Sequence, residues 1–243
     1  MLRLDQLLVA RGFYESRSRA RDAVLRGAVR VEGETAAKPA QSVAPNATIE
    51  IADAAQLYVS RAALKLAYAL DHFDVSPLGL AALDLGASTG GFTQVLLERG
   101  ARHVTALDVG HGQMAPDIAA DPRVTVLEGL NARDLGHSHL PEPPGIITAD
   151  ISFISLKLAL PPALALALPG ARLVALIKPQ FEAGRAHLSK DGVVRDAGVH
   201  DAVCRDIANW LESAMEWHVI GTTPSPVAGG SGNREFLLAA RKP

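Results

Sequence analysis

The sequence predicts an α/β protein, in which a doubly wound, mostly parallel sheet of seven strands follows a small N-terminal α+β domain. Three observations lead to this prediction. From residue 60 onward, short apolar runs alternate with helical patterns, as in a parallel sheet covered on both faces. A glycine-rich turn, DLGASTGGFT at 84–93, separates the first such run from the next helix. Residues 1–38 carry eight cations and five acids, although the whole chain has a net charge of −2.

Residues 1–52 are predicted to form the small domain, with two helices and two short strands. The leucines of RLDQLLVARG fall on one helical face, and a glycine ends that helix. Ser16 or Ser18 is placed to cap a second helix in SRSRARDAVLRG. AVRVEG and ATIEIA have the alternation of short strands. Residues 53–59 are expected to link this domain to the second one, at 60–243.

The second domain is predicted to begin with a helix near Ser60 that carries Lys65. Its last two strands flank only a loop, so the final strand is expected to enter the sheet antiparallel. Strands are expected at 81–86, 103–109, 123–129, 145–151, 172–178, 217–222 and 235–241. Further helices are expected at 91–99, 112–120, 155–166 and 197–214.

Composition favours a cytoplasmic protein without a membrane partner. Hydrophobic residues make up 48% of the chain and charged residues 21%, which is ordinary for a soluble protein. Cys204 is the only cysteine, so an intrachain disulfide and a thiolate metal cluster are excluded. The start MLRLDQLL shows no secretory signal. The apolar run at 153–177 is broken by Lys157, three prolines and Arg172, which disfavours a membrane span. A monomer and a weak dimer both stay open.

The glycine-rich turn is predicted to hold a nucleoside-bearing cofactor at the carboxyl edge of the sheet. Gly86, Gly90 and Gly91 allow a ligand to approach the backbone closely. Asp84 is expected to face the crevice, and Asp108 ends the second strand, where an acid commonly binds ribose hydroxyls. The turn lacks the GxGxxG pattern and the lysine of phosphate-binding loops. This pattern fits S-adenosylmethionine, which has an amine and a ribose but no phosphate, although the turn alone leaves a dehydrogenase open.

Four polar side chains are expected to converge beside this turn. Asp150 and Lys178 end the fourth and fifth strands, so both should project from the carboxyl edge of the sheet. Lys65 lies on the helix before the first strand, and Glu235 begins the last strand. One such residue alone would read as a solvated charge or a helix cap. Four of them at one crevice indicate a catalytic site.

The N-terminal pattern RLD, SRSRA, GAVRVEGE and Lys38-Pro39 resembles the ribosomal-protein-S-four-like RNA-binding domains. This resemblance implies that cations on one exposed face of the second helix, together with others nearby, contact RNA phosphates. The expected RNA-binding residues are Arg3, Arg11, Arg17, Arg19, Arg21, Arg26 and Lys38.

Nine segments over nearly the whole chain carry a wider resemblance: SRSRA, VSRAALKL, DLGASTGGFT, ALDVGHGQ, EGLNARDL, ADISFISL, IKPQFEAGR, KDGVVRD and GNREFLL. They resemble the TlyA (haemolysin-A-like) ribosomal RNA ribose methyltransferases, which are related to FtsJ-type 2′-O-methyltransferases. The family generally has glycines where this chain has Ala62 and Ala63. The resemblance implies a Rossmann-like methyltransferase domain that uses S-adenosylmethionine. The cofactor-binding residues that it implies are Asp84, Gly86, Ala87, Ser88, Gly90, Gly91, Phe92, Asp108, Asn131 and Asp150.

The resemblance also implies an activity, the 2′-O-methylation of ribose at a cytidine of ribosomal RNA in assembled subunits. Lys178 would stabilise the weakly acidic ribose hydroxyl as it becomes an alkoxide. Asp150 would pair with both Lys178 and Lys65, and Glu235 would complete the network and position the ribose. No metal is expected, because the positive sulfur already activates the methyl donor and the histidines lack ligand spacing.

Other interpretations are weighed against this one. A pore-forming haemolysin would suit the family's historical label, but the interrupted apolar run and the absence of a visible signal disfavour it. A non-catalytic RNA-binding factor in ribosome assembly would not need four converging polar residues. A base-methylating enzyme would usually carry an NPPY-like or cysteine nucleophile motif, which the sequence lacks. The loop at 179–196 is predicted either to contact RNA or to act as a lid.

Overall fold

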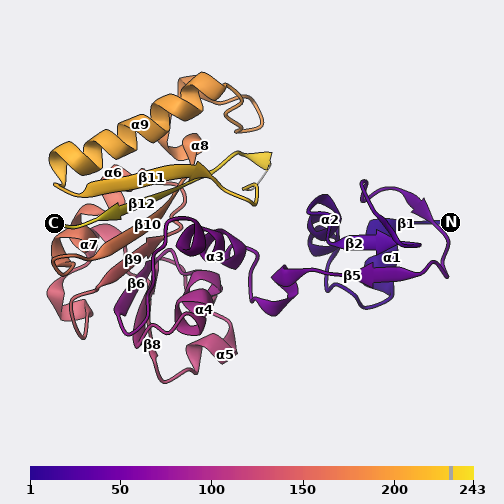
Figure 1. Ribbon diagram of the computed structural model, residues 1–243, viewed down its shortest axis with the longest axis horizontal. Helices are drawn as coiled ribbons and strands as arrows, with labels where there is room; N and C mark the ends of the chain where they lie inside the picture. The colour runs from indigo at the N-terminus through magenta and orange to yellow at the C-terminus, as the bar shows by residue number, and fades with distance from the viewer. Residues whose placement is uncertain (230–231) are drawn as a thin grey trace. The chain divides into compact units, whose positions relative to one another are not determined.

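A computed structural model describes residues 1–229 and 232–243 of the chain. These residues form two compact units, 1–57 and 58–243 (Figure 1). Each unit buries its own apolar side chains, in one cluster for the smaller unit and in two for the larger. Among the described residues, no helix combines the length and the apolar character that crossing a bilayer requires.

The N-terminal unit packs two helices against short antiparallel strands. Its elements are β1 (Leu2–Arg3), α1 (Leu4–Ala10), α2 (Arg17–Leu25), β2 (Val29–Val31), β3 (Glu34–Thr35), β4 (Ser42–Val43) and β5 (Ile49–Ile51). β1 pairs with β4, and β2 lies between β3 and β5. Ser16 caps α2 by accepting a hydrogen bond from the backbone N–H of Arg19 at 3.3 Å. The sequence pattern predicts both helices, β2 and β5, but not the two-residue strands.

Asp53 holds the end of this unit in place. Its side chain is 3% exposed and accepts hydrogen bonds from the Arg26 guanidinium at 2.8 Å and from the Tyr14 hydroxyl at 2.9 Å. The backbone N–H of Ala55 donates to the same carboxylate at 3.1 Å. Arg26 therefore turns inward, and only 19% of its side chain is exposed. The prediction that Arg26 lies on an exposed RNA-binding face is wrong, because a buried carboxylate holds its guanidinium.

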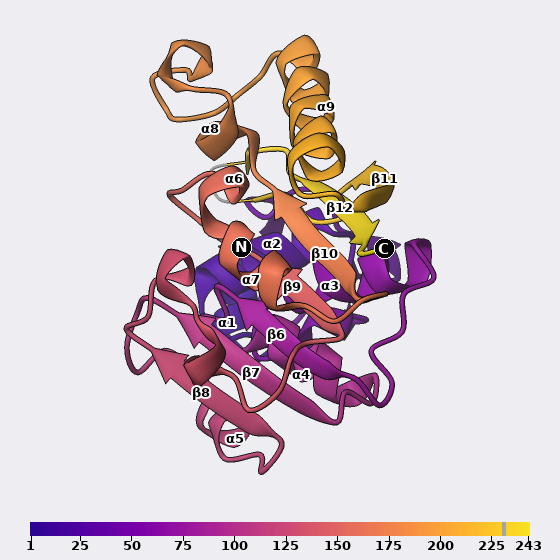
Figure 2. The same cartoon turned by 90° about the vertical axis from the view of Figure 1, so that its left-hand side faces the viewer.

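The C-terminal unit is built on the predicted seven-stranded sheet (Figure 2). Its strands are β6 (Ala81–Leu85), β7 (His103–Asp108), β8 (Val124–Glu128), β9 (Ile146–Ala149), β10 (Arg172–Ile177), β11 (His218–Pro224) and β12 (Phe236–Arg241). Their order across the sheet is β11-β12-β10-β9-β6-β7-β8. Strands β6 to β10 are parallel, and β12 lies antiparallel between β10 and β11. The mostly parallel α/β fold and its antiparallel last strand are confirmed.

Helices cover both faces of the sheet (Figure 1, Figure 2). They are α3 (Ala63–His72), α4 (Gly91–Glu98), α5 (Pro116–Ala119), α6 (Leu156–Ala159), α7 (Pro161–Leu166), α8 (Pro179–Glu182) and α9 (Ala197–Ala214). Leu66 of α3 and Leu96 of α4 are buried in one core cluster. Leu160, Ile207 of α9 and Trp217 are buried in the other. With apolar side chains on both faces, the central strands read as continuous hydrophobic runs.

The helix expected at 155–166 is two short helices, α6 and α7, which meet at Leu160. Pro161 and Pro162 cause the break, because proline has no backbone N–H to donate and its ring clashes with the preceding turn. Proline suits the first position of a helix, where α7 begins. The single turn α8, directly after β10, is not predicted by the apolar pattern.

We expect Asp53→Ala to destabilise the N-terminal unit by about 3 kcal/mol, because it leaves Arg26 and Tyr14 without their acceptor. Hydrogen exchange of the α2 and β2 amides in the full chain would measure the loss. The matched control is Glu50→Ala, since Glu50 lies 3.9 Å from Arg30 and both side chains are more than half exposed. Its effect should stay within about 0.5 kcal/mol. Equal effects of the two variants would contradict the structural role of Asp53.

Candidate active site

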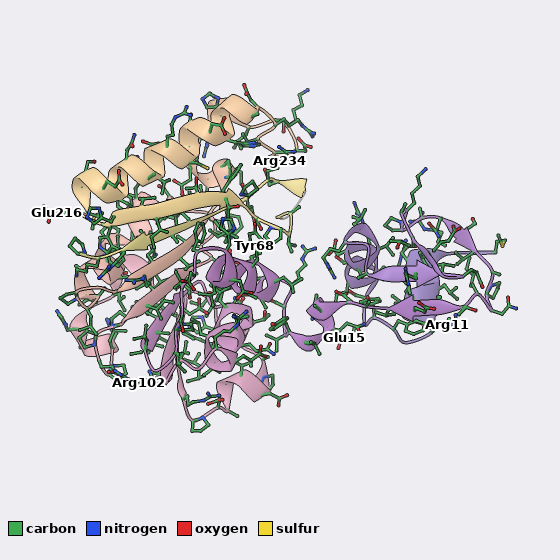
Figure 3. All side chains as sticks on the ribbon, in the orientation of Figure 1. Arg11, Glu15, Tyr68, Arg102, Glu216 and Arg234 are labelled. Carbon is green, nitrogen blue, oxygen red and sulfur yellow. The ribbon has the colours of Figure 1, made fainter. Side chains whose placement is uncertain are left out.

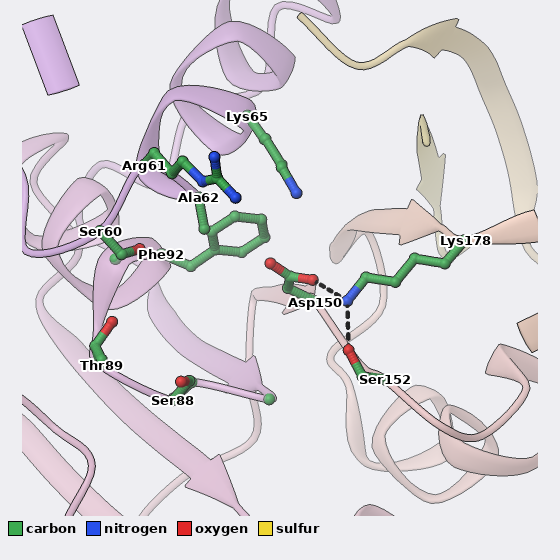
Figure 4. A pocket seen from close by; sticks show the side chains of 13 residues that line it. Ser60, Arg61, Ala62, Lys65, Ser88, Thr89, Phe92, Asp150, Ser152 and Lys178 are labelled. Carbon is green, nitrogen blue, oxygen red and sulfur yellow. Dashed lines mark hydrogen bonds and ion pairs between the residues drawn. The ribbon is translucent and has the colours of Figure 1, made fainter. Parts of the chain in front are cut away.

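Three hollows lie at the carboxyl edge of the sheet, and Asp150 and Ser152 line all three. The turn hollow, of about 290 Å³, lies against the glycine-rich turn (Figure 4). The apolar hollow, of about 660 Å³, is lined by residues that include Leu107, Asp108, Val109, Asn131, Ile151 and Leu158. The lysine hollow, of about 400 Å³, is lined by residues that include Lys65, Phe153, Lys178, Gln180, Asp191 and Glu235.

The glycine-rich turn lies so close to its neighbours that two of its positions have no room for a side chain. Gly86 has a φ of +79°, and a Cβ there would lie 2.6 Å from the backbone carbonyl oxygen of Asp150. A Cβ at Gly91 would collide with the hydroxyl of Ser60. The turn therefore contacts directly both the strand end that carries Asp150 and the segment that leads into α3.

The expected cofactor-binding residues divide between the hollows. Gly86, Ala87, Ser88, Gly91 and Phe92 line the turn hollow, together with Asp150. Asp108 and Asn131 line the apolar hollow, which Asp150 also reaches. Gly90 has a φ of +93° and precedes α4, but it is not among the residues that line the three hollows.

Backbone N–H groups fix the carboxylate of Asp108 at the end of β7. Ser88 donates to one oxygen at 2.8 Å, and Gly110 donates to the other at 2.7 Å. Ser88 has a φ of +45°, and this conformation turns its N–H toward the carboxylate. Each carboxylate oxygen can accept more than one hydrogen bond, so Asp108 can still bind hydroxyl groups in the apolar hollow.

Asp84 lies behind the turn and not in the crevice. Its side chain is fully buried and accepts hydrogen bonds from the hydroxyls of Thr93 at 2.7 Å and Thr148 at 2.9 Å. The prediction that it faces the crevice is wrong, because Asp84 lies inside β6, in register with Thr148 and two positions before the level of Asp150, and its carboxylate meets α4 and β9. Burial raises the pKa of Asp84 to about 6. Asp84 therefore helps to hold the turn and does not line any of the three hollows.

Lys178 and Asp150 form one ion pair of the site. The Lys178 ammonium lies 2.6 Å from Oδ1 of Asp150 and donates to the hydroxyl of Ser152 at 2.7 Å (Figure 4). The side chains of Lys178 and Asp150 are 9% and 17% exposed. Both extend from the carboxyl ends of neighbouring parallel strands, as the sequence predicts. Removing an ammonium group from water costs free energy, and a carboxylate at this distance offsets much of that cost.

Lys65 and Glu235 form the second ion pair, with 2.6 Å between the ammonium and Oε2. Their side chains are 9% and 3% exposed. The predicted pairing of Asp150 with Lys65 is wrong: within the described residues, Lys65 makes its ion pair with Glu235 and Asp150 makes its own with Lys178. The cause is that α3 packs against β12, so that Lys65 faces the beginning of that strand. All four side chains still line one hollow, the lysine hollow.

The sequence does not predict one exposed aromatic side chain at this hollow. Phe153 is 89% exposed, has a φ of +69°, and packs its ring 5.2 Å from that of Phe181 between centroids. It lines both the apolar and the lysine hollows. In the sequence, ADISFISL reads as core, because a phenylalanine among apolar residues is usually buried. Ser60 and Arg61, which line the turn hollow, also lack a distinctive pattern.

The predicted RNA-binding cations of the N-terminal unit, of which Figure 3 labels Arg11, differ in what they contact. Arg3 and Arg17 both pair with the buried carboxylate of Asp5, at 3.0 and 2.9 Å. The hydrogen bond from Arg3 contributes most to a pKa of Asp5 of about 2. With Arg21, these two arginines border a hollow of about 460 Å³.

Two of the remaining cations of that set, Arg19 and Arg11, have partners near them within the N-terminal unit. Arg19 pairs with exposed Glu15 at 3.2 Å, and Arg11 donates to the backbone carbonyl of Ala47 at 2.6 Å. Lys38 is exposed. Of the expected RNA-binding cations, Arg3, Arg17 and Arg21 are therefore the ones that border a common hollow.

Comparison with known proteins places this geometry in a family. The FtsJ-like methyltransferase family matches residues 58–242, and the S4 domain family matches residues 2–49. The chain belongs to the FtsJ-like methyltransferase family. It is 42% identical over 240 residues to the 16S/23S rRNA (cytidine-2′-O)-methyltransferase TlyA of Mycobacterium tuberculosis, a match that covers 98% of this chain and 89% of that protein. The resemblance found in the sequence is confirmed.

Two further relatives of this FtsJ-like methyltransferase match over nearly the full length. Hemolysin A of Brachyspira hyodysenteriae is 39% identical, over 97% of this chain and 98% of that protein. A structure from Streptococcus thermophilus, described as a candidate hemolysin, has a TM-score of 0.77 and 37% identity and covers 99% of this chain and 88% of that one. The Bacillus cereus O-methyltransferase in complex with SAH, at a TM-score of 0.52 and 18% identity, shares the fold.

The raised pKa of Asp84 predicts how its contribution to stability changes with pH. Its pKa is about 6 in the folded protein, compared with 3.8 for an ordinary aspartate in water, so its carboxyl group favours folding most below pH 3.8. This advantage is lost as the pH rises through 6. The free energy of unfolding of the wild type relative to Asp84→Asn should fall by about 3 kcal/mol from pH 4 to pH 8.

Urea unfolding of both proteins over this pH range would measure the difference. Asp121→Asn is a control of opposite sign, because the hydrogen bond from Arg123 lowers the pKa of Asp121 to about 2. The stabilising effect of Asp121 should be lost as the pH falls. If the difference in the free energy of unfolding between wild type and Asp84→Asn did not change with pH, it would contradict the conclusion that burial favours the uncharged form of Asp84.

Proposed function

We propose that this protein transfers a methyl group from S-adenosylmethionine to the ribose 2′-hydroxyl of a cytidine in ribosomal RNA. The observation that carries the proposal is the pair of ion pairs, Lys178–Asp150 and Lys65–Glu235, around one hollow beside a glycine-rich cofactor turn. Relatives named as rRNA cytidine-2′-O-methyltransferases support the substrate. A substrate of this kind is found in the cytoplasm, on ribosomal subunits or their RNA.

The residues of the turn and apolar hollows fit the proposed cofactor. Asp108 would bind the ribose hydroxyls through its remaining lone pairs, and the apolar wall at Val109 and Ile151 would contact the adenine. The backbone from Gly86 to Gly91 and the hydroxyl of Ser60 would hold the amino-acid end of the cofactor. A Cβ on either of these glycines would collide with Asp150 or Ser60, which line the same hollow. The bound sulfonium supplies a methyl group that is already activated for transfer to a nucleophile.

Lys178 is placed to stabilise the negative charge that develops on the ribose oxygen. An ammonium group has three N–H donors, and Lys178 directs one to Asp150 and one to Ser152. The third N–H is left for the substrate in the lysine hollow. Because this group is nearly buried, its attraction for an oxyanion is much less screened than in water. Asp150 fixes the direction of the ammonium and thereby positions the oxygen for attack.

Lys65 and Glu235 would position the ribose in the same hollow. The Glu235 carboxylate accepts one hydrogen bond from Lys65, which leaves lone pairs for a neighbouring hydroxyl. Lys65 keeps two N–H donors for the ribose or its phosphate. Since each ammonium group has its own carboxylate, the hollow as a whole carries no net charge from these four groups. This balance limits the desolvation cost of bringing both lysines together.

Phe153 offers the target nucleotide a stacking surface. A ribose in structured RNA reaches a buried lysine only if its nucleotide leaves the helix, as in enzymes that act on flipped bases. The flipped base then needs a new stacking partner, and stacking on an aromatic ring contributes about 1–3 kcal/mol per base. Phe153 is exposed at the rim of the lysine hollow and backed by Phe181. The S4 domain would hold the surrounding RNA through its outward-facing arginines.

We expect Lys178→Ala to lower kcat by about 100-fold or more, because the developing alkoxide loses its ammonium partner. The affinity for S-adenosylmethionine should be nearly unchanged. Transfer of a tritiated methyl group to unmethylated ribosomal subunits would measure the rate, and nuclease mapping with mass spectrometry would identify one ribose 2′-O-methyl group. Lys157→Ala is the matched control, since Lys157 pairs with Asp206 outside the hollows. Wild-type turnover by Lys178→Ala, or a methyl group on a base, would refute the proposed function.

Changing Arg17, Arg19 and Arg21 together to glutamate should weaken binding to ribosomal subunits and make it less dependent on salt. Each lost phosphate contact reduces the slope of log K against log salt concentration by about 0.7 to 0.9. A salt titration of subunit binding would show both effects. Arg241→Glu, at the end of β12 in the other unit, is the control. If the slope of log K against log salt concentration were unchanged in the triple variant, the proposed RNA-binding role of these arginines would be wrong.

A further inference from the structure

Gln180, which lines the lysine hollow, has a buried side-chain oxygen that no described residue pairs with. Gln180 belongs to α8. Its side-chain oxygen Oε1 is buried and accepts no hydrogen bond, and within the part of the chain that the structure describes it is the one buried side-chain nitrogen or oxygen in this condition. Such atoms are rare in folded proteins, because an acceptor removed from water loses free energy unless a donor replaces the water. Its presence at a proposed binding site points to a donor on the ligand.

The position of Gln180 indicates which part of a nucleotide would meet it. Lys178, two residues earlier, points to the place of the ribose oxygen, and Phe181, the next residue, packs against Phe153. Gln180 therefore lies between Lys178, which would contact the sugar, and Phe181, whose ring packs against the Phe153 ring that would stack on the base. Gln180 and Phe153 also line the same hollow. A donor on the base, and not on the phosphate, is the group that this oxygen would meet.

The four RNA bases differ in the donors that they present. Cytosine carries an exocyclic amine at carbon 4, whereas uracil carries a carbonyl oxygen at the same place. An amide oxygen can accept a hydrogen bond from the amine of cytosine. Against uracil, two acceptor oxygens would face each other, and the buried oxygen would stay unpaired. An acceptor at this position therefore favours cytosine over uracil, two bases of nearly the same size.

We propose that Gln180 is a specificity-determining residue whose side-chain oxygen accepts a hydrogen bond from the exocyclic amine of the target cytosine. This inference rests on the proposed function, ribose methylation of a nucleotide in the lysine hollow. It gives Gln180 a role that stability does not explain, because Oε1 makes no hydrogen bond within the fold. Replacing the amide by an apolar group of similar size removes an unpaired buried acceptor and should leave the fold at least as stable.

The test compares methyl transfer to ribosomal subunits that carry the target cytidine with transfer to subunits in which that nucleotide is uridine. The proteins are wild type, Gln180→Leu, Gln180→Glu and the control Asn209→Leu, which changes an exposed amide on α9. The wild type should prefer cytidine in kcat/KM by about 10- to 100-fold. Gln180→Leu should bring this ratio close to one by slowing transfer to cytidine. Gln180→Glu, which presents only acceptors, should keep the preference, and Asn209→Leu should behave as the wild type.

Two further measurements separate base selection from a structural role. The melting temperature of Gln180→Leu should equal or exceed that of the wild type, and its affinity for S-adenosylmethionine should be unchanged. A lower melting temperature, an unchanged cytidine-to-uridine ratio in Gln180→Leu, or a wild-type preference for uridine would overturn the assignment of Gln180 while leaving the proposed function intact. Wild-type protein that methylates neither kind of subunit would instead refute the proposed function itself.

Discussion

An ammonium group that is almost completely shielded from water needs a carboxylate beside it, and Lys178 has Asp150 at 2.6 Å. This contact joins the aspartate that lines all three hollows to a lysine that lines two of them. The two residues end neighbouring parallel strands, so their separation is fixed by the backbone hydrogen bonds of β9 and β10 and not by flexible loops. Asp150 also borders the turn hollow, and its backbone carbonyl lies directly against Gly86. One residue thus connects the proposed cofactor site with the proposed site of the acceptor.

The second pair, Lys65 and Glu235, solves the problem that two lysines at one hollow would otherwise create. Like charges close together in a partly dry site repel each other strongly, and each would favour loss of a proton. Here each lysine has its own carboxylate at 2.6 Å, and the carboxylates come from different elements. The site therefore offers several N–H donors to an oxygen without a large net charge. Such preorganised donors need little rearrangement as charge develops during a reaction.

Sequence reasoning predicts well what depends on chain pattern. The seven strands, the antiparallel last strand and the positions of Asp150, Lys178 and Glu235 follow from apolar periodicity and from the rule that functional groups lie at strand ends. The depth of a single side chain near a strand end is less predictable. Asp84 lies inside β6, opposite Thr148, whereas Asp150 follows the last residue of β9, and two threonines from other elements bury Asp84.

Pairing between distant residues is where prediction from sequence fails. Lys65 could meet either Asp150 or Glu235, and the choice depends on how α3 packs against β12, which no local pattern encodes. Arg26 directly follows α2, a helix with three arginines, yet Asp53, 27 residues later, turns it inward. Phe153 is exposed although its neighbours in the sequence are apolar. In each case a contact with a residue distant in the sequence decides where the side chain lies, whatever the neighbouring residues in the sequence favour.

The insertion of β12 between β10 and β11 has a consequence for how the protein is synthesised. Glu235 follows Lys65 by 170 residues, so a ribosome must add all of these residues before Lys65 can meet its carboxylate. A nascent chain arrested earlier has an incomplete sheet, with the flank of β10 that β12 would cover left unpaired. A chain that stops before residue 235 therefore lacks the carboxylate that pairs with Lys65, and with it one wall of the lysine hollow.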